Sequence, residues 1–138
     1  MRSTVFPTKI DLNQSWSLLK QNIDSIYKIK DYKQQTGMDD YQLVYSVCVA
    51  VPKSHSDELY ENFNSYLTNL CCGIKQKIKE SNHKSLSLYT DNWNLYFEGS
   101  IYVNTICGYM NRYFESRNQH QKSFINLAKN AWKTIIAV

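Results

Sequence analysis

The side chains that could carry chemistry are few in this sequence and lie far apart. Three histidines occur, each in a polar stretch between apolar segments: His55, His83 and His120. A zinc site needs several such ligands converging at about 2 Å from the ion, and structural sites show short, regular ligand spacings. The sequence contains no Cys-x-x-Cys or His-x-x-x-His spacing, and the adjacent pair Cys71-Cys72 cannot easily chelate one ion from a helix. We expect neither a metal nor a cofactor.

Candidate nucleophiles and acid–base pairs are equally isolated. Cys107 falls among apolar residues, where a thiol is usually inert. No Gly-x-Ser-x-Gly, P-loop or Rossmann glycine pattern is present, and the whole chain has only four glycines. The acidic pairs Asp39-Asp40 and Asp57-Glu58 stand at the expected starts of helices, where carboxylates complement the helix dipole. We therefore expect a binding protein rather than an enzyme.

Apolar residues recur every three or four positions along most of the chain, which is the period of an amphipathic α-helix. Such stripes occupy residues 12–27, 41–49, 59–78, 86–97, 101–114 and 124–136. They predict an all-α fold, a helical bundle of five to six helices in one domain. We expect this domain to comprise residues 12–138 and residues 1–11 to form a flexible N-terminal segment. We expect Asp39 or Asp40 to cap the second helix, and Gly99 to end or kink a later one.

Charge and hydropathy narrow the class of partner. The net charge is +4, with Lys and Arg spread along the chain, whereas a nucleic-acid surface usually needs a basic stripe. No stretch approaches the roughly 18 consecutive apolar residues of a membrane span, and the N-terminus lacks the apolar run of a signal peptide. We expect a protein of the cytoplasm and nucleus, with no membrane partner and with buried free thiols at Cys48 and Cys107.

Aromatic residues make up 14% of the chain, and eleven of them are tyrosines. The three tryptophans fall on apolar stripes, and we expect them to pack in the core: Trp16, Trp93 and Trp132. Two groups are denser in tyrosine than a core stripe requires, namely Tyr41/Val44/Tyr45 and Tyr109/Tyr113. Because tyrosine is enriched at binding hot spots, each group fits an interface as well as it fits a core.

Five motifs, in order and in register, resemble the first repeat of the cullin family. The first two are Leu12-Asn13-Gln14-Ser15-Trp16 and Tyr41-Gln42-Leu43-Val44-Tyr45-Ser46. The next two are Tyr66-Leu67-Thr68-Asn69-Leu70 and Leu88-Tyr89-Thr90-Asp91-Asn92-Trp93. The most specific is Val103-Asn104-Thr105-Ile106-Cys107-Gly108-Tyr109-Met110-Asn111-Arg112-Tyr113, which looks more like cullin-1 than like other cullins. From Leu12 to about Ala137, the chain resembles the N-terminal repeat of a cullin-1-like ubiquitin-ligase scaffold.

This resemblance implies a non-catalytic, adaptor-binding function. In the family, the second and fifth helices of this repeat dock an SKP-type adaptor, which holds an F-box protein as substrate receptor for ubiquitin-dependent degradation. Transferred motif by motif, the adaptor contacts would be Tyr41, Val44, Tyr45, Tyr109, Asn111, Arg112 and Tyr113. The family has a His-Val pair where this chain has Val47-Cys48, followed by Val49 in place of a tyrosine. That departure would weaken or redirect adaptor binding.

The chain also lacks the later repeats and the C-terminal half that binds a RING-box protein in the family. The resemblance therefore implies no RING-box protein binding, and a fragment or a competitor rather than a complete scaffold. Two other functions stay open: a helical interaction module with a different partner, and weak nucleic-acid binding through the basic surface. The salt dependence of binding affinity distinguishes these two functions, because binding to phosphates weakens steeply with salt whereas binding through an aromatic-centred protein interface changes little.

Overall fold

The computed structural model describes residues 11–28, 37–50, 53–81 and 85–137, which form six α-helices and no strand. The helices are α1 (Leu12–Lys28), α2 (Gly37–Cys48), α3 (Ser56–Lys79), α4 (Ser85–Ile106), α5 (Gly108–Glu115) and α6 (Phe124–Ile135). The predicted all-α bundle is thus confirmed. The segment predicted to be flexible, residues 1–11, lies almost wholly outside the described residues. None of these helices combines the length and apolar content that crossing a membrane requires.

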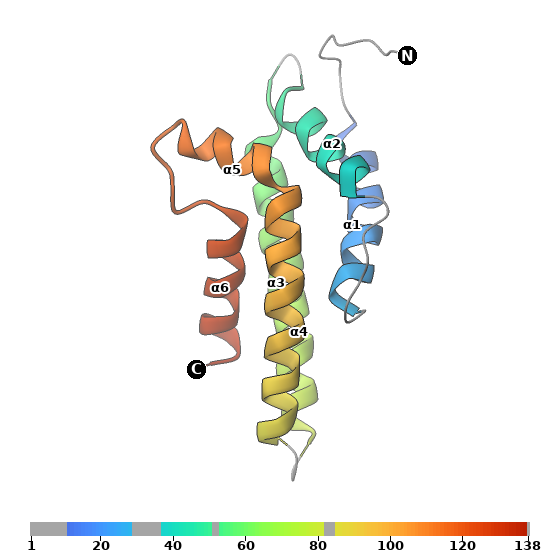
Figure 1. Cartoon of the computed structure of the whole chain (residues 1–138), viewed down its shortest axis with the longest axis vertical. Helices are drawn as coiled ribbons and strands as arrows, with labels where there is room; N and C mark the ends of the chain where they lie inside the picture. Colours follow the sequence, from blue (N-terminus) through green and yellow to red (C-terminus); the bar gives the residue numbers. More distant parts are fainter. Residues whose placement is uncertain (1–10, 29–36, 51–52, 82–84, 138) are drawn as a thin grey trace.

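Two long antiparallel helices, α3 and α4, form the centre of the molecule (Figure 1). Helix α1 packs mainly along α4 on one side, and α6 packs along α3 on the other. The shorter helices α2 and α5 lie against each other across one end of this pair. Segments from the first and last thirds of the chain are thereby brought together at that end.

The core is built from the apolar stripe of each helix. In α3 the buried side chains follow at steps of three or four residues: Leu59, Phe63, Leu67, Cys71 and Ile74. Phe63 meets the ring of Phe124 from α6 edge-on, with centroids 5.1 Å apart. Burying each such side chain stabilises the fold by about 1.5–3 kcal/mol. Trp132 is buried, and Trp16 and Trp93 are half-buried against the core, which confirms their predicted packing role.

Gly99 does not end α4, so the prediction of a helix end there is wrong. The helix continues through it to Ile106. The residue is buried, and a Cβ atom there would lie 2.9 Å from Cδ1 of Tyr27. Glycine is needed because the Tyr27 ring of α1 passes close to the α4 backbone. Its hydroxyl then bonds Ser100 Oγ at 2.8 Å.

The start of α2 also differs from expectation. The helix begins at Gly37, so Asp39 and Asp40 lie within its first turn rather than at its N-cap. Asp40 is completely buried and accepts a hydrogen bond from the Asn22 side chain at 2.6 Å. The buried carboxylate therefore joins α2 to α1, while both acids remain where they complement the helix dipole.

Candidate functional site

The two tyrosine-rich groups come together where α2 meets α5. The ring of Tyr45 meets the ring of Tyr109 edge-on, with centroids 4.7 Å apart and planes at 82°. The Arg112 guanidinium donates a 2.6 Å hydrogen bond to the hydroxyl of Tyr41, across 71 residues of sequence. We call the surface formed by Tyr41, Tyr45, Tyr109 and Arg112 the α2–α5 face. Its residue types are those enriched at protein-binding hot spots.

The side chains of the face differ in exposure. Tyr45 is 42% exposed, one of the most exposed large apolar residues among those the structure describes. Tyr41 and Tyr109 are half-buried, and the Arg112 guanidinium lies 5.6 Å from the centre of the Tyr109 ring. Edge-to-face ring pairs and cation–π contacts each contribute about 1 kcal/mol. The rings are therefore held in place before any partner arrives.

Val44, a predicted contact, lies beneath this face rather than on it. Its side chain is 0% exposed and belongs to the hydrophobic core, as does Met110 of α5. Gly108 opens α5, and a Cβ atom there would lie 3.4 Å from the Tyr41 ring. Val44 thus supports the face from below, and in this chain it has no surface to offer a partner.

Asn111, another predicted contact, uses its side chain to hold α6. Its Oδ1 accepts a hydrogen bond from the Phe124 backbone N–H at 3.0 Å, and its Nδ2 donates to Asn104 Oδ1 at 3.0 Å. Asn104 Oδ1 also accepts from the backbone N–H of Ile125 at 3.0 Å. These N–H groups open α6, where no intrahelical acceptor exists. We call Asn104 and Asn111 the asparagine latch.

The role of Asn104 was missed from the sequence. The only available signal is its spacing of seven residues from Asn111, which would place the two amides on one face if residues 101–114 formed the single helix that the apolar stripe predicts. The structure instead places Asn104 on α4 and Asn111 on α5. The N-cap residue Ser123 completes the start of α6 by accepting from the Asn126 N–H at 3.3 Å. The latch thereby joins α4, α5 and α6.

Tyr113 lies at the edge of the α2–α5 face. It is half-buried against Phe114, with ring centroids 5.1 Å apart, and the Arg117 guanidinium covers its ring at 3.7 Å. A partner that uses Tyr113 must therefore contact or displace Arg117.

Among the described residues, no three potential metal ligands cluster together, and His83 falls outside them. His55 and His120 each face a different glutamate, Glu58 of α3 at 3.6 Å and Glu115 of α5 at 3.9 Å. Burial raises the pKa of Cys71 to about 11 and that of Cys107 well above its usual range, which keeps both thiols protonated near neutrality. Cys48 and Cys107 are buried and free, as predicted.

Comparison with known proteins agrees with the helical arrangement. The sequence model of the family described as "Cullin alpha solenoid domain" matches residues 16–138. Cullin-3 of Caenorhabditis elegans is 26% identical over 99% of this chain and 18% of its own length. Cell division control protein 53 of Saccharomyces cerevisiae is 23% identical over 97% of this chain and 20% of its own. Cullin-1 of Schizosaccharomyces pombe is 23% identical over 75% of this chain and 16% of its own length. The chain thus spans about a fifth or less of the length of these relatives.

Proposed function

The chain belongs to the cullin family, and we propose that its α2–α5 face docks an SKP-type adaptor carrying an F-box protein. In this proposal the chain acts as a binding module of a ubiquitin-ligase scaffold and serves ubiquitin-dependent protein degradation. It works by binding, with no catalysis of its own. The relatives named cullin-1 and cell division control protein 53 support a function of this class.

One observation carries the proposal. Two tyrosine-rich groups from the first and last thirds of the chain converge on one surface, and Tyr45 there stays 42% exposed although its ring is held by Tyr109. A group needed only for the core would bury its rings. An aromatic and arginine platform, fixed in advance, instead loses little side-chain entropy on binding.

The structure also bears on the departure from the family pattern in α2. Val47 and Cys48 are buried, and Val49 is half-buried. Substitutions at the two buried positions change the packing under α2 rather than the exposed rings of the α2–α5 face. Adaptor binding through Tyr45 and Tyr109 is therefore compatible with them.

Titrating the purified chain with an SKP-type adaptor by calorimetry tests the proposal. A hot-spot tyrosine contributes about 2 kcal/mol or more, so Tyr45→Ala should raise the Kd roughly thirtyfold. Leu18→Ala is the matched control, because Leu18 is similarly exposed, at 49%, but lies on α1. Binding should change little between low and moderate salt.

Three outcomes would contradict the proposal. The parent chain could fail to bind the adaptor, which would leave the family fold without this function. Leu18→Ala could weaken binding as much as Tyr45→Ala, which would place the interface elsewhere. Affinity could instead fall steeply with salt, which would indicate an interface dominated by charge.

A further inference from the structure

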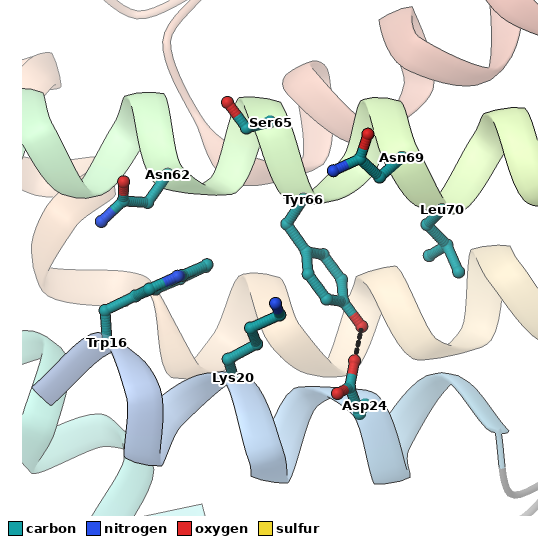
Figure 2. A pocket seen from close by; sticks show the side chains of 8 residues that line it. All are labelled: Trp16, Lys20, Asp24, Asn62, Ser65, Tyr66, Asn69 and Leu70. Carbon is teal, nitrogen blue, oxygen red and sulfur yellow. Dashed lines mark hydrogen bonds between the residues drawn. The ribbon is translucent and has the colours of Figure 1, made fainter. Parts of the chain in front are cut away.

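A second surface lies between α1 and α3 and extends onto α4, and it shares no lining residue with the α2–α5 face. A half-open pocket of about 320 Å³ runs between these helices, and Figure 2 shows the side chains that line it. A second pocket of about 390 Å³ continues from it and shares Asn69 and Leu70 as lining residues. We call the two together the α1–α3 groove.

The groove has a rigid aromatic side. The indole of Trp16 packs edge-on against the buried ring of Phe63, with centroids 5.2 Å apart. The hydroxyl of Tyr66 donates a 2.7 Å hydrogen bond to Asp24 Oδ1 (Figure 2). Trp16 is only half-buried, so part of its apolar ring is exposed to a partner at one end of the groove.

The polar side chains of the groove have unused hydrogen-bonding capacity. Among the residues that the structure describes, no hydrogen bond or ion pair is formed by the side chains of Lys20, Asn62, Ser65 or Asn69. In Figure 2 the Lys20 ammonium points into the groove, towards α3. Amide groups spaced along one helix, with an ammonium opposite, can bind the carbonyl and amide groups of an extended chain.

The charged side chains that line the groove are mostly positive. Three lysines line it, Lys20 in the first pocket and Lys28 and Lys77 in the second. Asp24 is the one carboxylate among the lining residues, and it already accepts the bond from Tyr66. We propose that the α1–α3 groove binds an acidic, extended peptide segment of a partner protein, with an apolar side chain on Trp16 and carboxylates on the lysines.

Helix geometry specifies the spacing of such a peptide. Lys20 and Lys28 are eight residues apart on α1, or about 12 Å along its axis, while Trp16 lies about 6 Å before Lys20. An extended peptide advances about 3.3 Å per residue and repeats a face every second residue. The matching segment therefore has an apolar residue, an acid two positions away, and a second acid four positions further on.

Fluorescence anisotropy with synthetic peptides tests this inference. The probe is a fluorescein-labelled nine-residue peptide with one leucine and two glutamates at this spacing, used in both sequence directions. A peptide with lysines in place of the glutamates is the negative control. Lys20→Glu and Lys28→Glu should each raise the Kd of the acidic probe roughly two- to fivefold, as expected for exposed charge pairs. Lys133→Glu changes the net charge equally on α6, outside the groove, and should have no such effect.

Several results would overturn the inference. They are an absence of binding at millimolar probe in both directions, equal binding of the lysine peptide, and an equal loss with Lys133→Glu. Loss of probe binding in the Tyr45→Ala/Tyr109→Ala variant would place the peptide on the α2–α5 face instead. A short single-stranded RNA that bound more tightly, with the same sensitivity to Lys20→Glu, would reassign the groove to nucleic acid.

Discussion

Replacing Asn111 by alanine should destabilise the whole chain, although Asn111 was first identified as a candidate contact for a partner. The substitution removes the acceptor of the Phe124 N–H and the donor to Asn104 Oδ1, both at 3.0 Å. Each intramolecular hydrogen bond contributes about 1 kcal/mol net, and a partly buried N–H left without an acceptor costs further. We expect the free energy of unfolding to fall by about 2 kcal/mol, and Tm by about 8 °C for a chain of this size.

Asn64→Ala is the matched control. Asn64 lies on α3, is exposed, and its side chain forms no hydrogen bond among the described residues. Both substitutions gain the same helix propensity, about 0.6 kcal/mol, so their difference isolates the asparagine latch. Urea unfolding followed by circular dichroism measures the free energy of unfolding of each variant.

The adaptor titration can also show whether Asn111 contacts the adaptor directly or only positions the helices. If Asn111 only positions helices, folded Asn111→Ala protein at low temperature should bind the adaptor with nearly the parent affinity, whereas Tyr45→Ala should not. A free energy of unfolding for Asn111→Ala within about 0.5 kcal/mol of that for Asn64→Ala would refute the structural role assigned to the latch.

Further predictions concern the core. Gly99→Ala should lower the free energy of unfolding by about 1 kcal/mol, because the clash with Tyr27 outweighs the gain in helix propensity. Gly73→Ala should raise it by about 1 kcal/mol, because a Cβ atom there would have no neighbour within 4 Å. Equal effects of the two substitutions in urea unfolding would contradict this. A thiol reagent at neutral pH should label Cys72 quickly and the three buried cysteines only on unfolding, as mass spectrometry of the native chain can show. Burial raises the pKa of Tyr27 and Tyr96 above the unfolded value of about 10, so both keep their protons in the native state. The contribution of these two tyrosines to stability is therefore full below about pH 10 and should fall above it by up to about 1.4 kcal/mol per pH unit for each group; an unfolding free energy that stays constant from about pH 10 to about pH 11 would argue against this.

The number and type of the helices could be predicted from the sequence, because amphipathic periodicity is a local property. A buried stripe needs apolar residues three or four positions apart, and α3 shows these without any knowledge of its neighbours. The two tyrosine-rich groups were likewise visible as composition. The errors at Gly99 and Asp40 have one cause. Gly99 contacts Tyr27 of α1, and Asp40 is hydrogen-bonded to Asn22 of α1. Contacts between residues so far apart in sequence cannot be predicted from the local sequence pattern.

The roles within the candidate site were decided by the tertiary structure. Sequence placed Val44, Tyr45 and Asn111 in one set of candidate contacts. Packing buries the first, exposes the second and commits the third to the start of α6. The α1–α3 groove had no sequence signal at all, because its lining side chains come from three helices, α1, α3 and α4, brought together only by packing. Periodicity determines which side of a helix is buried, but only the assembled bundle determines which exposed side chains become neighbours.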